Sequence, residues 1–233
     1  MNDSTKGMSR FELEEALRQR GCAVCRLVER AGGSYVEYLL YDLVNDPDVH
    51  KEFRASLGLC GRHAQGMLEK GDGLGVAILY GAAVKELLDL LSKIPDAPRS
   101  QASLTRLLGR STRTDPVIPE PGDGCMVCNA EGEAERRYLR VLLDGAQDGS
   151  LEDGLLDGPG SVCVRHLSRA TMLAGGWLPP ALIDASREAL RDLEADLGRY
   201  VWHSDYRFRK EPWGKERDSW KRVVDRMLGP RRE

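Results

Sequence analysis

The sequence predicts an all-α protein made of two homologous helical repeats, each stapled by one Cys3His metal site, with a C-terminal helical extension. Three observations support this prediction. Apolar residues recur at helical spacing along most of the 233 residues. No segment alternates apolar and polar residues for long enough to suggest a convincing strand. The Cys and His motifs of the first half return at a constant offset of 103 residues, Cys22 to Cys125 and Cys60 to Cys163, so an internal repeat has to be considered first.

The first repeat is expected to span residues 1–94. Its expected helices are, in order, a segment ending at Gly21, a long one over Cys25–Leu43, a short one ending at Gly58, and a pair that starts near Cys60, breaks at Gly71–Gly73 and ends near Ile94. The long helix contains Gly32 and Gly33, each of which costs about 1 kcal/mol relative to alanine, so an interruption is expected there.

Residues 95–124 are rich in proline, serine and glycine and are expected to form a linker with a short helical piece over 104–108. The second repeat, 125–200, aligns with the first without gaps and ends in a long helix from about Pro180 to Tyr200. Its middle has diverged in sequence, yet its length is unchanged, which indicates a geometric constraint. The extension, 201–233, has no counterpart in the first half.

The cysteine motifs carry the strongest chemical signal. All six cysteines and two of the four histidines fall in them, as two Cys-x-x-Cys pairs and two Cys-x-x-His pairs. The candidate metal ligands are Cys22, Cys25, Cys60, His63, Cys125, Cys128, Cys163 and His166. Three thiolates and one imidazole form a ligand set that Zn²⁺ accepts in tetrahedral geometry. A helix is expected after each Cys-x-x-Cys pair, where its dipole helps keep thiolates ionised.

Two zinc ions are therefore the expected cofactors, with iron–sulfur clusters as the alternative, because three Cys and one His can hold either. A thiol-based redox pair would want a thioredoxin-like βαβ context, which the sequence lacks, and would leave Cys60, Cys163 and both histidines unused. A c-type haem is excluded because Arg26 and Asn129 stand where the axial histidine would follow.

The eight ligands can be divided between two sites in two ways. The first hypothesis closes each site within its own repeat, so that Cys22 and Cys25 share an ion with Cys60 and His63. The alternative exchanges partners, so that Cys22 and Cys25 close with the Cys-x-x-His pair of the second repeat. The spacing does not distinguish them, because the gap from Cys25 to Cys60 equals the gap from Cys128 to Cys163.

Three thiolates and a dication leave about one net negative charge at each site. Arg62 and Arg165, inside the Cys-x-x-His pairs, are candidates to offset that charge from outside the ligand shell. The alternative is that both are solvated residues at the start of a helix.

The extension carries ten Lys or Arg against six Asp or Glu, an excess of four positive charges in a chain with a net charge of −3. We expect Tyr206, Arg207 and Arg209 to line a groove for an anionic ligand or an acidic partner protein, with His203 at its edge. In the alternative, the aromatic residues pack back on the helices and the arginines pair with carboxylates. The final helix is interpreted as ordinary core packing, with one apolar stripe made of Trp220, Val223, Val224, Met227 and Leu228.

Composition and charge narrow the possible functions. A slightly acidic chain is not expected to bind nucleic acid over its whole surface. No apolar run approaches the roughly 20 residues that a membrane helix needs, and residues 1–10 lack the apolar core of a secretion signal. A cytoplasmic protein is expected, where paired cysteines more often hold metal than form disulfides. No nucleophile–base pair or phosphate-binding loop is found outside the metal motifs, so a structural or interaction module is favoured over an enzyme. The alternative function is an iron–sulfur or thiol-based redox protein or sensor that uses the same Cys and His ligands.

The segments "CAVCRL", "LVNDPDVHKEFRASLGLCGRHA" and "SDYRFRKEPWGKERDSW", together with the second Cys/His set, resemble a bacterial and archaeal family of uncharacterised helical proteins, a domain of unknown function. The resemblance covers nearly the whole chain, and the cysteine pairs and Asp205-Tyr206-Arg207 are its most specific parts. Ala23 and Met126 stand where members often carry proline, which leaves the ligands unchanged. The resemblance implies the helical architecture and no known reaction.

Overall fold

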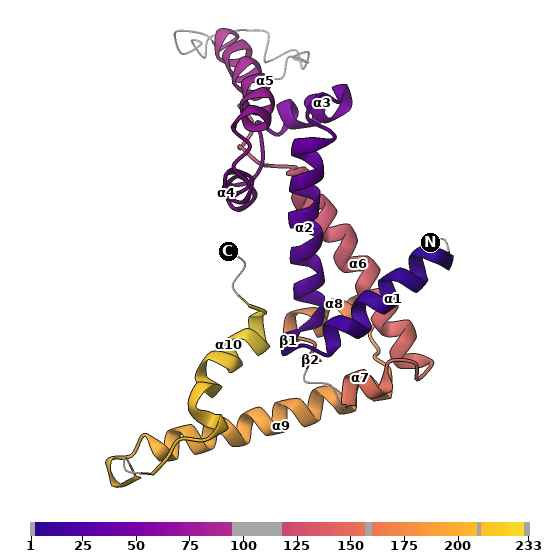
Figure 1. Cartoon of the computed structure of the whole chain (residues 1–233), viewed down its shortest axis with the longest axis vertical. Helices are drawn as coiled ribbons and strands as arrows, with labels where there is room; N and C mark the ends of the chain where they lie inside the picture. The colour runs from indigo at the N-terminus through magenta and orange to yellow at the C-terminus, as the bar shows by residue number, and fades with distance from the viewer. Residues whose placement is uncertain (1–2, 95–117, 157–159, 209–210, 231–233) are drawn as a thin grey trace, which may run out of the picture. The chain divides into compact units, whose positions relative to one another are not determined.

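The structure is a computed structural model and describes residues 3–94, 118–156, 160–208 and 211–230. Within these residues the chain is helical almost throughout, as expected (Figure 1). The α-helices are α1 (Asp3–Leu17), α2 (Ala23–Tyr41), α3 (Pro47–Ala55), α4 (Gly61–Glu69), α5 (Gly73–Ser92), α6 (Met126–Gln147), α7 (Glu152–Leu156), α8 (Val164–Leu173), α9 (Pro180–His203) and α10 (Ser219–Leu228). Two short 3₁₀ helices, η2 (Tyr206–Phe208) and η3 (Lys215–Asp218), lie between α9 and α10. The helical piece expected over 104–108 lies outside the described residues.

The chain divides into two compact units. Unit 1 contains residues 1–31 and 131–233, and unit 2 contains residues 32–130. The divisions fall inside α2 and α6, so each unit contains parts of both repeats. The expected interruption of the first long helix is wrong, because α2 continues through Gly32 and Gly33. The boundaries drawn at 94, 125 and 200 follow the sequence repeat and stay a prediction, as does the common origin of the two repeats.

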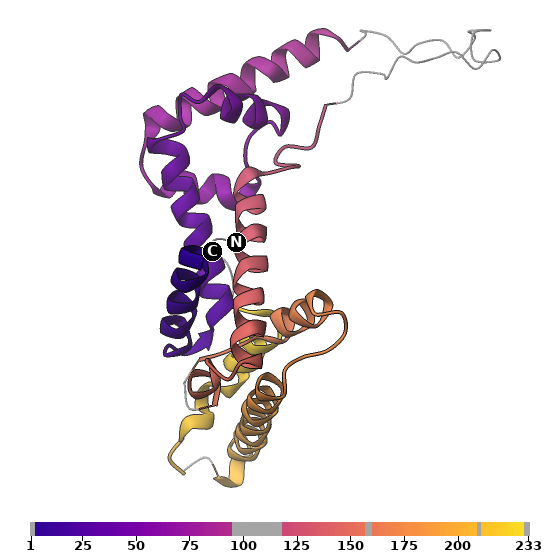
Figure 2. The ribbon, with the colours of Figure 1, turned by 90° about the vertical axis from the view of Figure 1, so that its right-hand side faces the viewer.

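Unit 1 is built around a core that joins its two chain segments. Leu13 and Leu17 of α1, Val24 of α2, Leu142 of α6 and Leu182 of α9 are all buried in one apolar cluster. A two-residue parallel strand pair, β1 (Gly21–Cys22) and β2 (Gly160–Ser161), links the segments directly, with Cys22 opposite Ser161. Figure 2 shows α8 and α9 of this unit turned by 90° from the view of Figure 1. The strand pair brings the first Cys-x-x-Cys motif next to the second Cys-x-x-His motif.

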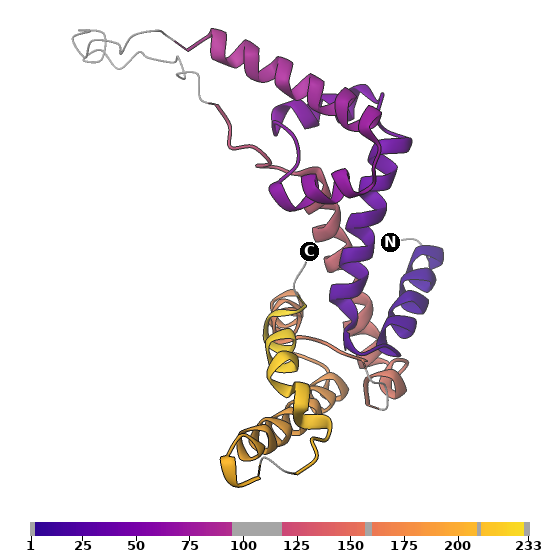
Figure 3. The same cartoon turned by 60° about the vertical axis from the view of Figure 1, so that its left-hand side comes forward.

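Unit 2 contains α3, α4 and α5 together with the C-terminal part of α2, and these helices pack against the start of α6. Asp46 caps α3 by accepting hydrogen bonds from the amides of Asp48 and Val49. Phe53 of α3 is fully buried and packs edge-to-face on Tyr80 of α5, with ring centroids 5.0 Å apart. Figure 3 shows α3 and α5 side by side. These contacts fix the chain just ahead of the Cys-x-x-His motif at α4.

The turn into that motif depends on glycine. Gly58 has a φ of 107°, and a Cβ there would lie 2.7 Å from the Tyr80 ring. Gly122 has a φ of 81° and donates its N–H to the Ser56 carbonyl at 2.8 Å. A Cβ at this position would clash, because it would lie only 2.5 Å from the Cys60 Cα. The segment before α6 therefore lies directly against the backbone of Cys60.

The extension packs on unit 1, where α10 contacts α8, α9 and β1. The prediction that the apolar stripe of α10 forms core packing is wrong. Trp220, Val224 and Met227 are 50%, 54% and 48% exposed, whereas Arg226 and Ser219 are buried. The helix therefore presents its polar face to the unit, and the reason lies at the neighbouring cysteine cluster. Among the described helices, none combines the length and apolar character needed to cross a bilayer.

Candidate metal centres

All four ligand pairs lie at the N-terminus of a helix, three residues apart. Cys60 and Cys163 are the N-cap residues of α4 and α8, with nearly identical backbone angles (φ −64°, ψ 159° and φ −68°, ψ 158°). Cys22 and Cys125 directly precede α2 and α6. The second ligand of each pair lies in the first helical turn and so faces the same side as the first. The helix expected after each Cys-x-x-Cys pair is confirmed, and the positive end of its dipole favours thiolates.

The eight side chains gather into two clusters. Cluster A consists of Cys22, Cys25, Cys163 and His166 and lies within unit 1. Its His166 Nδ1 atom lies 3.3, 3.4 and 3.2 Å from the Sγ atoms of Cys22, Cys25 and Cys163. The Sγ atoms of Cys25 and Cys163 are 3.8 Å apart. All four residues of cluster A are buried.

Cluster B consists of Cys60, His63, Cys125 and Cys128 and lies within unit 2. Its His63 Nδ1 atom lies 3.3, 3.5 and 3.4 Å from the Sγ atoms of Cys60, Cys125 and Cys128. The Sγ atoms of Cys60 and Cys128 are 3.6 Å apart. Cys128 is exposed and Cys60 is half-buried, while the other two are buried.

The first pairing hypothesis, with each site closed inside its own repeat, is wrong, and the exchanged pairing is observed. Each cluster combines the Cys-x-x-Cys of one repeat with the Cys-x-x-His of the other. The physical reason is backbone contact between distant segments. The β1–β2 pair sets Cys22 beside the chain leading to Cys163, and Gly122 packs on Cys60. Equal spacing in the two repeats satisfies both pairings, so spacing alone could not decide.

The distances fit a single tetrahedral ion. Bonds of about 2.3 Å to sulfur and about 2.0 Å to nitrogen place two sulfurs about 3.8 Å apart and a sulfur and a nitrogen about 3.5 Å apart. The observed separations in both clusters, 3.2 to 3.8 Å, lie at or slightly inside these values. The ligand atoms of each cluster therefore already surround a space of the right size for one ion, and all eight predicted ligands belong to these two groups.

The cysteines within each cluster perturb one another's pKa values. Hydrogen bonds from Cys22 and Cys25 lower the pKa of Cys163, whereas the bonds that Cys25 makes to Cys163 and Cys22 raise its own pKa. In cluster B, burial opposes ionisation of Cys125, but hydrogen bonds from His63 and from backbone groups outweigh it and lower its pKa to about 6. Burial and the neighbouring sulfurs raise the pKa of Cys128 to about 12. Within each cluster the pKa of one thiol is therefore lowered and that of another is raised.

His166 of cluster A is held from behind by a carboxylate. Its Nδ1 faces the sulfurs, and its Nε2 lies 2.7 Å from Oε1 of Glu135 on α6. Burial opposes protonation of the ring, but hydrogen bonds to Cys163 and Cys22 raise its pKa to about 9. Burial also opposes ionisation of Glu135, yet Arg169 and His166 outweigh it and keep its pKa below the usual value. A carboxylate–histidine pair of this kind orients metal-binding histidines in proteins.

Two residues at the C-terminal end of α10 cover cluster A, the cationic Arg226 and the C-cap residue Gly229. Arg226 of α10 is only 9% exposed, and its Nε has no hydrogen-bond partner among the described residues. Burial lowers the pKa of its guanidinium, and the charges of Cys22 and Cys163 act in the opposite direction. Gly229 has a φ of 86°, and a Cβ there would lie 2.8 Å from the Cys25 Sγ. The buried face of α10 therefore places a guanidinium and a glycine beside the sulfurs of cluster A.

Glu135, Arg226 and Gly229 were not predicted from the sequence as neighbours of the clusters. The residues predicted for that place were Arg62 and Arg165, which lie half-buried in the first turns of α4 and α8. Their part in offsetting the charge of the sites stays a prediction. One difference between the two repeats could have pointed to Glu135. The equivalent position of the first repeat, 103 residues earlier, is Gly32, so the carboxylate occurs in the second repeat alone.

Comparison with families of related proteins matches residues 6–233 to a family of unknown function (DUF6062). The chain belongs to this family. It is 26% identical over 189 residues to a protein named "Uncharacterized 23.9 kDa protein in xynA 3'region" from Caldicellulosiruptor sp. (strain Rt8B.4), and the aligned part covers 81% of each chain. No solved structure matches the chain. The resemblance to a helical family of unknown function is thereby confirmed.

Of the four residues expected to form the anion-binding groove, the structure describes His203, Tyr206 and Arg207. Tyr206 is 80% exposed, and the guanidinium of Arg207 pairs with Asp205 at 2.7 Å. His203 is largely buried, stacks on Trp213 with centroids 4.9 Å apart, and lies 3.4 Å from Glu216. Arg209 lies outside the described residues. An anionic ligand or acidic partner at this segment stays a prediction, and in the structure Arg207 already has a carboxylate partner.

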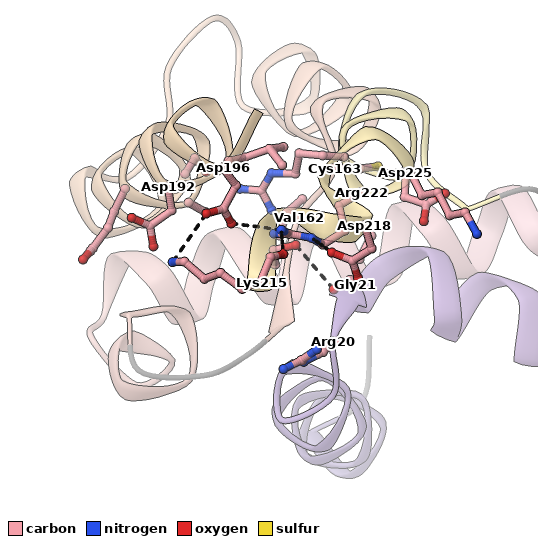
Figure 4. A pocket seen from close by; sticks show the side chains of 18 of the residues that line it. Arg20, Gly21, Val162, Cys163, Asp192, Asp196, Lys215, Asp218, Arg222 and Asp225 are labelled. Atoms are coloured by element: carbon pink, nitrogen blue, oxygen red, sulfur yellow. Dashed lines mark hydrogen bonds and ion pairs between the residues drawn. The ribbon is translucent and has the colours of Figure 1, made fainter. Parts of the chain in front are cut away.

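A cleft of about 1190 Å³ lies between α9, β1–β2 and the η3–α10 segment (Figure 4). Asp196 of α9 is buried beside it and accepts a hydrogen bond of 2.9 Å from Arg222, which also binds Asp218 at 2.7 Å. Lys215 approaches Asp196 to 3.8 Å. These ion pairs join the extension to α9, and Cys163 forms part of the cleft lining. The cleft therefore borders cluster A on the side that α10 covers.

Proposed function

We propose that this protein binds two zinc ions, one in cluster A and one in cluster B, and uses them to hold a helical scaffold that serves as a structural or interaction module. One observation carries the proposal. In each cluster three sulfurs and one Nδ1 atom, drawn from distant parts of the chain, converge to the separations that a tetrahedral zinc ion requires.

The choice of zinc over an iron–sulfur cluster is supported by the same distances. In a polynuclear cluster the protein ligands bind different iron atoms and are spread around the cluster. Here the four ligand atoms of each group all lie within 4.8 Å of one another, and the sulfur–nitrogen separations are 3.2 to 3.5 Å. There is space between them for one ion and not for several with bridging sulfides. Zinc is the usual occupant of a closed Cys3His site.

A structural role is favoured over catalysis because each set of ligands is complete. A catalytic zinc keeps one position open for water or substrate, whereas four protein ligands close the tetrahedron. Each ion would also cross-link remote segments, Cys25 with Cys163 across 138 residues and Cys60 with Cys128 across 68. Loop closure of these lengths contributes about 5 and about 4 kcal/mol, comparable to the net stability of a domain.

An interaction role is supported by the surface of the extension. The exposed stripe of Trp220, Val224 and Met227 on α10 and the exposed Tyr206 are the kind of apolar and amphipathic side chains that protein interfaces use. The metal at cluster A would hold α10 in place through its polar face and so present this stripe.

Metal analysis of the purified, reduced full-length protein tests the proposal. We expect two zinc ions per chain by inductively coupled plasma mass spectrometry and a colourless preparation. Chelation should remove both ions and broaden the thermal transition while part of the helicity is retained, because the helices have apolar faces of their own. Iron with visible absorbance, fewer than two ions, or an unchanged melting curve after chelation would contradict it.

A further inference from the structure

The clusters offer a matched pair of sulfurs in two different environments. By the 103-residue offset, Cys60 and Cys128 of cluster B correspond to Cys163 and Cys25 of cluster A. The sulfur–sulfur distances are similar, 3.6 Å in cluster B and 3.8 Å in cluster A. The first pair is half-buried and exposed, whereas both members of the second pair are buried. Ligand type, spacing and helix position are shared, so a difference in reactivity between the two pairs follows from their surroundings, solvent access first among them.

Cys163 belongs to the lining of the cleft, yet it is 0% exposed and Cys25 is 2% exposed, so neither sulfur of the cluster A pair is open to solvent. Gly229 lies against the sulfurs of Cys25 and Cys163, and Arg226 is buried beside the cluster. The extension has no counterpart in the first repeat, and Cys128 is exposed at the first turn of α6. A small oxidant can therefore reach a sulfur of cluster B and is kept from the equivalent sulfur of cluster A.

We propose that cluster B is a peroxide-responsive zinc site, in which oxidation joins Cys60 to Cys128 and releases the ion. This inference rests on the proposed function, since it requires zinc at the site. The exposed Cys128 is the sulfur that reacts first with peroxide. The Cys60 sulfur, 3.6 Å away, then forms the disulfide with it.

The chemistry requires only a two-electron peroxide oxidant. The Cys128 thiolate attacks one oxygen of hydrogen peroxide, which breaks the O–O bond, forms sulfenic acid and expels hydroxide. The Cys60 thiolate then attacks the sulfenic sulfur, forms the S–S bond and expels a second hydroxide. Two thiolates have lost two electrons in total, and the peroxide has gained them. Two of the four zinc ligands are lost, so His63 and Cys125 alone no longer form a closed site.

The new bond replaces the cross-link that the metal provided. It closes the same 68-residue loop between Cys60 and Cys128, so the chain entropy constraint on unit 2 is kept. We therefore expect zinc release without loss of the helices of unit 2. A thiol reductant restores the ligands, which makes the response reversible.

The test uses the reduced, full-length protein after its zinc content has been measured. Hydrogen peroxide is added in the presence of a chromophoric zinc indicator, and the product is alkylated, digested and analysed by mass spectrometry. We expect one equivalent of zinc to leave ahead of the other, a disulfide-linked peptide pair containing Cys60 and Cys128, unchanged far-ultraviolet circular dichroism, and recovery of zinc binding after dithiothreitol. The cysteines of cluster A should still be reduced when the first equivalent has left.

Two histidine variants sharpen the test, because a Cys2His2 set still holds zinc. Cys128→His should keep its ion in the presence of peroxide, while Cys25→His, at the equivalent buried position, should release one equivalent as the wild type does. If the protein holds no zinc at the start, the proposed function fails and this inference fails with it. If two ions are bound and leave together, if cluster A is oxidised first, or if peroxide releases none, the inference alone is overturned. The wild-type measurement decides even if a variant does not fold.

Discussion

Clusters A and B contain the same four ligand types, at the same spacing and at the N-termini of corresponding helices, and they differ in what surrounds them. In cluster A, Glu135 orients His166, Arg226 brings a positive charge, and Gly229 closes over the sulfurs. All three come from positions that the first repeat does not supply, because Gly32 stands in place of Glu135 and the extension is unrepeated. Cluster B lies in a unit without the extension, and its Cys128 is exposed.

On the two proposals above, one motif serves two purposes according to its surroundings. A site that is buried, charge-compensated and buttressed is suited to permanent cross-linking. A site with an accessible sulfur is suited to exchange or reaction. The ligands themselves do not determine which outcome applies, so the distinction can be tested by changing the neighbours.

The largest expected effect comes from removing equivalent ligands. If loss of one ligand releases the ion, Cys163→Ser should lower the free energy of unfolding of unit 1 by up to about 5 kcal/mol, and Cys60→Ser that of unit 2 by up to about 4 kcal/mol, the values for opening these loops. All four tryptophans lie in unit 1, so tryptophan fluorescence reports that unit specifically. We expect the fluorescence transition to shift to lower denaturant in Cys163→Ser and to stay near its wild-type midpoint in Cys60→Ser, where circular dichroism detects the loss. Equal fluorescence shifts in both variants would argue against separate sites in separate units.

Weakening the support of His166 should affect one ion only. Glu135→Gln keeps the shape of the side chain and removes the charge behind the ring, so the zinc affinity of cluster A should fall by about 10- to 100-fold. Competition with a chelator of known affinity measures the two ions separately. The matched control is Glu133→Gln, an exposed position on the same helix. A loss of affinity at both sites, or the same loss in the control, would contradict the assigned role.

Opening the cover of cluster A should make it more like cluster B. Gly229 has a φ of 86° and a ψ of 161°, a region that only glycine adopts readily, and a Cβ there would clash with Cys25. Gly229→Ala should therefore weaken the packing of α10 by about 1–2 kcal/mol and raise the alkylation rate of Cys25 in the metal-bound protein. Gly175→Ala is the control, because Gly175 has a φ of 73° and no atom within 4 Å of its Cβ position. Equal alkylation of Cys25 in both variants would show that the cover is not what protects it.

The smallest effect concerns pH. Burial opposes ionisation of Asp196, but hydrogen bonds from Arg222 and Arg199 lower its pKa below the ordinary value near 4. Its stabilising contribution is therefore complete above that value and is lost as the pH falls through the lower folded-state pKa. The contact between α9 and α10 should weaken in this acidic range, which tryptophan fluorescence can follow. Asp196→Asn should remove about 1–2 kcal/mol at neutral pH and reduce the acid dependence. An identical acid profile in the variant would exclude Asp196 as the cause.

The helices and the ligand residues could be predicted from the sequence because both depend on local patterns. Apolar spacing identified α4, α5 and α9, and the placement of all six cysteines in four short motifs identified the eight ligand residues, although not their grouping. The same motifs predicted that the ligands lie at helix N-termini. These features require only residues within one or two turns of one another.

The pairing of the motifs and the surroundings of cluster A depend on contacts between distant segments, which local patterns do not contain. Exchange between repeats follows from the β1–β2 pair and from the packing of Gly122 on Cys60. The orientation of α10 was misjudged because an apolar stripe normally faces a core. Here Arg226 is buried beside cluster A and Trp220 is exposed, so the apolar stripe of α10 faces away from the unit.

The exchanged pairing is the central claim, and zinc retention in two double variants tests it most directly. Cys25→Ala/Cys163→Ala removes two ligands from cluster A and leaves cluster B intact, so one ion should remain bound with wild-type affinity against a competing chelator. Cys25→Ala/Cys60→Ala removes one ligand from each cluster, so no ion should remain with that affinity. The reverse result, with one tightly held ion in Cys25→Ala/Cys60→Ala and none in Cys25→Ala/Cys163→Ala, would mean that each site closes within its own repeat.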